Sequence, residues 1–165
     1  MKGKDALAYV LYNMGCIHPF ILSRIVALAE LAYLKEKKKR LTDLKYSGVQ
    51  AAFYIENLNK IIDEDNCFLK HEGDPAKKIM GCIEYICELK NLDENTKYLD
   101  DAIDKAYDLT ENELNDLVIK DEHYRELISW LDKNAGEFKK VKSFFRIENN
   151  TISEIIILFI NINYY

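Results

Sequence analysis

The sequence predicts a mainly α-helical fold, a single compact multi-helix domain with at most a short β-hairpin or strand pair. Apolar residues recur at helical spacing through most of the chain, and several of these segments begin with residues that cap helices. A length of 165 residues with 48% hydrophobic content is enough for one core and short for two ordinary domains. We therefore expect residues 1–165 to fold as one unit.

The first part of the chain predicts three helices. Residues 6–14 carry a helical apolar stripe, and residues 20–35 are apolar on nearly every side, which is typical of a central helix. Ser47 can then cap a third helix through residue 62, with its stripe on Ala51, Ile55, Leu58 and Ile62. This prediction places Gly48 in a tight helix-entry turn.

Six further elements are expected between residue 62 and the C-terminal segment. Residues 67–69 could form a brief strand, and Asp74-Pro75 would begin a helix with its buried stripe on Ile79, Cys82, Ile83 and Ile86. Helices are expected from Asp93, from Thr110 with Glu113 as a capping box, and from Asp121. A turn-rich helix near residues 138–145 would follow.

The C-terminal segment, residues 151–165, contains six consecutive large apolar residues, Ile155 to Ile160, with Ile162 beyond. Its run from Ile155 to Ile160 is far shorter than the roughly 20 residues needed to cross a bilayer, so we expect no membrane span. We expect this segment to pack on the core or on a second copy of the chain, as a helix or as a strand.

The charge of the chain is modest overall and segregated locally. A net charge of -5 disfavours general affinity for nucleic acid. Residues 93–122 hold eleven acidic against three basic side chains, whereas residues 35–45 hold six basic against two acidic ones. Such asymmetry can steer a partner protein.

The four cysteines are expected to be buried thiols in a reducing cytosol. In an oxidising or hyperthermophilic setting, a disulfide such as Cys67–Cys87 is the alternative. We expect no cofactor and no metal; the weak candidates for a structural zinc site are Cys67, His71, Cys82 and Cys87. Cys82 and Cys87 differ by about 140° in direction on a helix, which argues against such a site.

Catalysis is not expected from the sequence. His18, His71 and His123 are scattered, and no nucleophile motif accompanies them. An enzyme, such as a hydrolase, would need a site assembled in space from distant residues. The chain carries no secretory pattern at its start, and we expect a cytoplasmic protein.

Several segments resemble a known family. The apolar helix ending at Tyr33-Leu34, the tetrapeptide Tyr46-Ser47-Gly48-Val49, and the stretch from Leu92 to Glu113-Leu114 together resemble the Panacea domain of SocA-like antitoxins over about residues 20–124. That family usually has Tyr-Gly-Pro-Val at the tetrapeptide, and its closing His-Trp segment is represented only by His123-Tyr124 and a displaced Trp130. The resemblance implies a mainly helical, non-enzymatic antitoxin or adaptor whose partner is a protein, such as a toxin.

Two kinds of binding surface follow as predictions. For a protein partner the candidate residues are Tyr46, Ser47, Gly48, Val49, Phe53, Tyr54, Asp100, Asp101 and Asp104. For a DNA-associated regulator, the alternative function, the candidate residues are Lys37, Lys38, Lys39, Arg40 and Lys45. A second copy of the chain is a further candidate partner.

Overall fold

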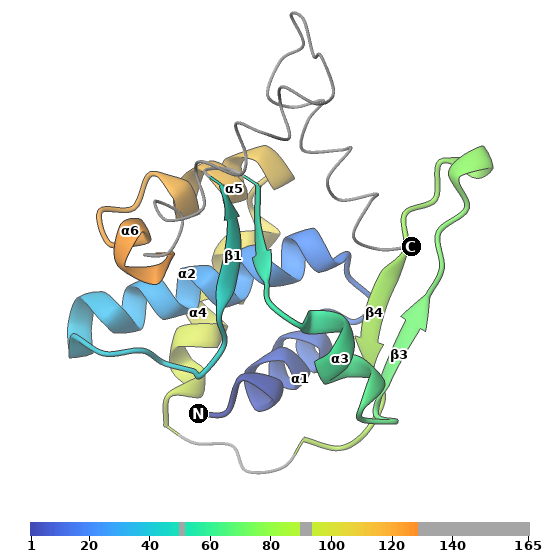
Figure 1. The fold of residues 1–165 in the computed structure, drawn as a ribbon, viewed down its shortest axis with the longest axis horizontal. Helices are drawn as coiled ribbons and strands as arrows, with labels where there is room; N and C mark the ends of the chain where they lie inside the picture. The colour runs from blue at the N-terminus through green and yellow to red at the C-terminus, as the bar shows by residue number, and fades with distance from the viewer. Residues whose placement is uncertain (50–51, 90–93, 129–165) are drawn as a thin grey trace, which may run out of the picture.

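The computed structural model describes residues 1–49, 52–89 and 94–128 (Figure 1). The elements in chain order are α1 (Gly3–Met14), α2 (Pro19–Lys37), β1 (Tyr46–Val49), β2 (Ala52–Ile55), α3 (Leu58–Asp63), β3 (Phe68–His71), the 3-10 turn η1 (Pro75–Lys77), β4 (Cys82–Tyr85), α4 (Thr96–Tyr107), α5 (Glu111–Ile119) and α6 (Tyr124–Leu127). The predicted helix near residues 138–145 and the apolar segment 151–165 lie outside the described residues.

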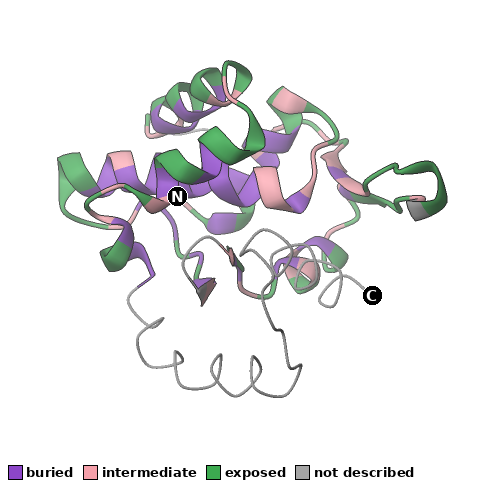
Figure 2. Cartoon of the chain, turned by 90° about the horizontal axis from the view of Figure 1, so that it is seen from above, coloured by how far each residue is buried: buried purple, intermediate pink, exposed green. Residues whose placement is uncertain are grey.

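Helix α2 forms the centre of the described fold. It contacts α1, α4, α5 and α6, which lie around it in Figure 1. Leu22, Ile25, Val26 and Ala29 are completely buried on it. Figure 2 shows buried residues concentrated along this central helix and exposed residues on the outer elements. The prediction of a central helix over residues 20–35 is confirmed, because a helix that is apolar all round needs neighbours all round.

Two charged side chains are nevertheless buried on α2. The Glu30 carboxylate accepts two hydrogen bonds from the Arg40 guanidinium, both 3.0 Å long, and others from the Leu41 and Thr42 backbone N–H groups. The Thr42 hydroxyl donates to the same carboxylate at 2.5 Å. Full pairing offsets the desolvation of a buried charge, so Glu30 fixes the loop after α2 against the helix.

Arg24 performs a similar task on the other side of the fold. Its guanidinium donates to the Asn115 side chain at 2.9 Å and to the Phe53 carbonyl at 2.7 Å. It also lies over the rings of Phe20 and Phe53, 3.7 and 4.0 Å from their centroids. Arg24 therefore links α2 to β2 and α5 by hydrogen bonds and cation–π contacts.

The predicted fold class is wrong. The described residues are 53% helix and 15% strand, and two antiparallel two-stranded sheets lie among six helices. The fold is therefore mixed rather than mainly α with at most one strand pair. The first sheet pairs β1 with β2 and the second pairs β3 with β4, as Figure 1 shows.

The first sheet replaces the start of the predicted third helix. Phe53 and Ile55 are buried while Tyr54 between them is exposed, which is the two-residue period of a strand. Gly48 lies within β1 opposite Phe53, with φ at 122°, and the Ser47 hydroxyl donates to Glu56 instead of capping a helix. The helix-entry turn predicted around Gly48 is therefore wrong, and only α3 remains of the predicted helix.

The second sheet replaces the helix predicted from Pro75. Pro75 begins only the short turn η1, and the chain then returns as β4, antiparallel to β3. Within the predicted helical stripe Ile83 is buried, but Ile79 and Ile86 are exposed. Alternate residues of β4 face opposite sides of the sheet, so Ile83 can be buried without a helix.

The helical predictions after residue 93 agree better with the structure. Helix α4 begins at Thr96, and α5 opens with the predicted capping box, since Thr110 N–H donates to the Glu113 carboxylate at 2.8 Å and Glu113 N–H donates to the Thr110 hydroxyl at 3.3 Å. The helix expected from Asp121 is described as α6, only as far as Leu127.

Candidate functional site

Two disulfides tie the β3–β4 hairpin. Cys67 and Cys87 close its base, with Cα atoms 5.3 Å apart, and Cys16 and Cys82 join it to the turn between α1 and α2, with Cα atoms 5.4 Å apart. All four cysteines are therefore oxidised, and the expectation of buried thiols is wrong. The Cys67–Cys87 pairing that the sequence left open is present. Thiol spacing along the chain could not indicate the other pair, because 66 residues separate its two members.

A backbone bridge places the α1–α2 turn beside β4. Ile17 and Ile83 exchange both backbone hydrogen bonds, at 3.0 and 2.9 Å, so an isolated antiparallel bridge joins the turn to β4. Neighbours of an antiparallel pair oppose each other, which places Cys16 opposite Glu84. Because side chains alternate, Cys82 and Glu84 share one face of β4, and His71 joins them opposite Cys82.

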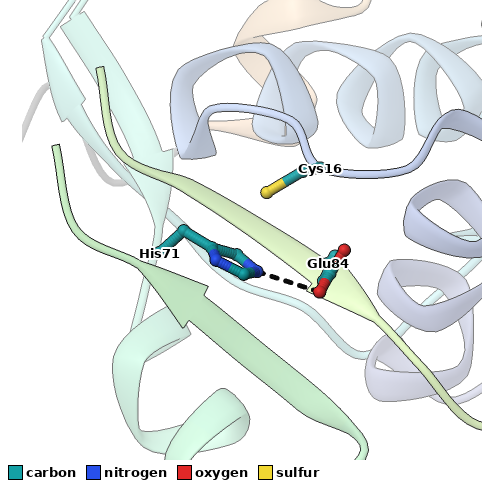
Figure 3. Close-up of side chains that lie close together, drawn as sticks. All are labelled: Cys16, His71 and Glu84. Atoms are coloured by element: carbon teal, nitrogen blue, oxygen red, sulfur yellow. Dashed lines mark hydrogen bonds and ion pairs between the residues drawn. The ribbon is translucent and has the colours of Figure 1, made fainter. Parts of the chain in front are cut away.

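Cys16, His71 and Glu84 converge on this face, as Figure 3 shows. The His71 Nε2 and Glu84 Oε1 atoms are 2.9 Å apart, and one ligand atom from each of the three residues lies within 4.8 Å of the other two. Sulfur, imidazole nitrogen and carboxylate oxygen are the donors that zinc prefers. The disulfide occupies the Cys16 sulfur, however, and only a thiolate is a strong metal ligand.

This cluster differs from the predicted zinc set. His71 belongs to it and Cys82 lies opposite His71, while Cys67 and Cys87 pair with each other at the base of the hairpin. Glu84 and Cys16 were missed. The alternation of Cys82 and Glu84 would have identified Glu84 if β4 had been predicted as a strand, but no pattern in the sequence indicates Cys16.

The predicted partner surface around β1 and β2 is largely internal. Tyr46 and Phe53 are 1% and 2% exposed, and their rings meet edge to face with centroids 6.0 Å apart. Ser47 is buried as well. The backbone of β2 lies so close to Gly48 that no side chain would fit there. Val49 ends β1. Tyr54, which is exposed, remains a contact candidate from this part of the set.

The acidic part of the predicted surface is accessible. Asp100, Asp101 and Asp104 are all exposed on α4, and Asp100 accepts a hydrogen bond from the Tyr9 hydroxyl at 2.6 Å. Beyond the α4–α5 turn a shallow groove of about 420 Å³ is lined by Leu109, Glu113, Asp116, Leu117, Lys120 and Asp121. Leu117 is exposed there, and two leucines, three acidic side chains and one lysine make up the lining.

The basic segment is partly committed to the fold. Arg40 is held by Glu30, and Lys37 pairs with Glu36 at 2.7 Å. Lys38 caps the end of α2 in a left-handed conformation, and Lys39 lies 6.0 Å from the centroid of the Tyr33 ring. Lys45 is exposed. The structure thus uses Arg40 for packing and leaves the lysines as the candidates for phosphate contacts.

His18 and His123, the two histidines outside the cluster, contact residues close to them in the chain. His18 caps α2, because its Nδ1 accepts a hydrogen bond from Phe20 N–H at 3.2 Å. Burial is the larger cause of the lowered pKa of the His18 imidazole, and the nearby Arg24 charge is the smaller one. His123 Nδ1 lies 2.9 Å from Glu126. With the four cysteines oxidised, none of them offers a thiolate nucleophile in this state. Among the described helices, none is both long and apolar enough to span a bilayer.

The chain matches no protein-family model, no curated protein and no solved structure. The resemblance to the Panacea domain therefore stays a prediction.

Proposed function

We propose that this chain is a non-enzymatic protein-interaction domain, antitoxin-like or adaptor-like, that binds its partner through the outer surface of α4 and α5. The observations that carry this proposal are the exposed carboxylates on α4 and the groove lined by residues of α5 and of the turns at its two ends. This surface retains the three acidic residues among the nine predicted from the sequence. Tyr54 lies on the exposed side of β2 and is not required by the proposal.

The chemistry of this surface favours a basic partner segment with an apolar anchor. Between residues 96 and 120 the chain carries seven acidic and three basic side chains, which favours encounter with lysine or arginine. Asp116 and Lys120, which both line the groove, form an ion pair one helical turn apart at 2.5 Å, and Leu117 is exposed. An apolar side chain from the partner could cover Leu117 while its basic residues meet Asp101 and Asp104.

The test compares two charge-reversed variants in the native cell. Asp101→Lys with Asp104→Lys alters the proposed surface, whereas Glu72→Lys with Glu88→Lys changes the net charge equally at exposed positions near the second sheet. Crosslinking and affinity purification should recover one protein with the wild type and the control, and lose it with the α4 variant. Leu117→Ala should weaken the same association without any change of charge. Recovery of the same proteins by all variants would contradict the proposed surface.

A DNA-associated regulator remains the second candidate function. The exposed Lys38, Lys39 and Lys45 support it, while the pairing of Arg40 and Lys37 with glutamates weighs against it. DNA binding should fall steeply with salt, because each phosphate contact releases counterions. A mobility shift that is lost between low and physiological salt, and lost in a variant with all three lysines changed to glutamine, would favour this candidate.

The disulfides bear on where the protein works. Disulfides persist in oxidising compartments and in the cytosol of some hyperthermophiles, and they are rare in a reducing cytosol. The two disulfides therefore weigh against the predicted cytoplasmic location in an ordinary mesophile. A second copy of the chain stays a candidate partner, and light scattering on the full chain tests it.

A further inference from the structure

We propose that reduction of the Cys16–Cys82 disulfide creates a zinc site formed by Cys16, Cys82, His71 and Glu84. Three separate parts of the chain supply these residues: the α1–α2 turn, the end of β3, and β4. The inference is independent of the partner surface on α4 and α5.

The sheet geometry brings the four ligands to one face. The Ile17–Ile83 bridge sets Cys16 beside Glu84, and the β3–β4 register sets His71 beside Cys82. Backbone hydrogen bonds hold both registers, so neither depends on the disulfide alone. The ligands are therefore positioned before any metal arrives, which lowers the entropy lost on binding.

The distances suit a small tetrahedral ion. Zinc bonds of 2.0–2.3 Å place the ligand atoms of a tetrahedron about 3.3–3.8 Å apart. The Cys16 sulfur, the His71 nitrogen and the Glu84 oxygen lie within 4.8 Å of one another, so movements of about one ångström bring these three atoms to tetrahedral spacing. Cys82 contributes the fourth donor: its sulfur lies outside this group of three and turns toward it once its bond to the Cys16 sulfur is broken. Two sulfurs, one nitrogen and one carboxylate oxygen favour zinc over calcium or magnesium.

A dithiol can act as the reductant of the Cys16–Cys82 disulfide. The dithiol transfers two electrons and two protons to the Cys16–Cys82 bond, becomes a cyclic disulfide itself, and leaves two thiols on the protein. Zinc then binds both sulfurs as thiolates and displaces their two protons to solvent. Because the metal bridges the same elements as the disulfide, the hairpin stays fixed to the α1–α2 turn in both redox states. A reducing cytosol would then favour the zinc form.

The experiment titrates the full chain with Co²⁺ and Zn²⁺ after reduction by a phosphine. Reduced wild-type protein should bind one Co²⁺ with the visible absorption of a tetrahedral thiolate site, and Zn²⁺ should displace it. The oxidised protein should show no such absorption. His71→Ala, Glu84→Ala and Cys16→Ser should each lower the Zn²⁺ affinity by at least about tenfold.

Two controls separate this site from other metal binding. His123→Ala removes a histidine that is likewise 2.9 Å from a glutamate but has no such cysteine cluster, and it should leave the affinity unchanged. Cys67→Ser with Cys87→Ser should also retain the metal. Far-UV circular dichroism follows folding of each reduced chain, and zinc should restore any signal that reduction removes.

Several results would overturn the proposal. Reduced wild type that binds no Co²⁺, or that unfolds and does not refold with zinc, would do so. Equal Zn²⁺ affinity in wild type and the His71→Ala and Glu84→Ala variants would also do so, since two cysteines alone would then explain the binding.

Discussion

Glu30 and Arg40 form a two-point ion pair at the end of the central helix, with both nitrogen–oxygen distances at 3.0 Å. Glu30 is fully buried, whereas the Arg40 side chain is 34% exposed. The carboxylate also holds the backbone of the following loop, which leads directly into β1. This single side chain therefore connects α2 to the first sheet.

Replacing Glu30 by alanine should destabilise the protein strongly. The change leaves the Leu41 and Thr42 N–H groups and the Arg40 guanidinium without their buried acceptor, which costs about 3–5 kcal/mol by comparison with other broken buried ion pairs. Denaturant unfolding followed by circular dichroism measures the loss. The exposed Glu111→Ala change on α5 serves as the control and should leave the midpoint close to that of wild type. Equal midpoints for the two variants would contradict the anchoring role.

Gly48→Ala should destabilise the protein more than Gly15→Ala. Both glycines have positive φ, 122° and 77°, a backbone conformation that costs other residues about 1–3 kcal/mol. At Gly48 a Cβ atom would also collide with the Ala52 carbonyl and would lie 2.6 Å from the Phe53 Cα, whereas at Gly15 no atom lies within 4 Å. Thermal unfolding of both variants measures the difference. A Gly15→Ala change that is equally harmful would show that φ, and not the contact between β1 and β2, dominates.

The sequence was most informative where local signals act alone. The stripe of α2 and the capping box at Thr110 depend on residues within a few positions of each other, and both predictions are confirmed. The brief strand predicted over residues 67–69 corresponds to β3. Its partner β4 and the whole first sheet were missed because short strands and helices share apolar spacings, so the residues around Ile55 and Ile83 fitted both patterns. The pairing of β1 with β2 and of β3 with β4 in the folded chain decides between strand and helix at these residues.

The candidate site was predictable only in part, for a related reason. His71 and Cys82 were among the weak metal candidates, but Glu84 needed the strand assignment and Cys16 needed a contact across 66 residues. The burial of Tyr46 and Phe53 could not be predicted from the sequence either, since an aromatic residue suits a core and an interface equally well. The acidic residues of α4 were placed correctly on an exposed face, because charged groups stay hydrated.

Either disulfide should contribute several kcal/mol to stability. In the chain-entropy model, loops closed over 20 and 66 residues correspond to about 3 and about 4 kcal/mol respectively. Cys67→Ala with Cys87→Ala should therefore lower the free energy of unfolding somewhat less than Cys16→Ala with Cys82→Ala. Chemical unfolding under non-reducing conditions compares the two double variants. A variant as stable as wild type would show that the corresponding bridge does not form in solution.

His18 should make the protein less stable as the solution becomes acidic. Burial, and then the Arg24 charge, lower the pKa of the folded imidazole below its ordinary value of 6.5, so the unfolded chain binds the proton more readily. The stabilisation from neutral His18 is complete well above pH 6.5 and is lost as the pH falls from there toward the lower pKa of the folded state. His18→Asn keeps an acceptor that can cap α2 at Phe20 and removes the titration. Between pH 7.5 and 5.5 the wild type should therefore lose more stability than this variant in urea unfolding, and parallel losses would exclude His18 as the responsible group.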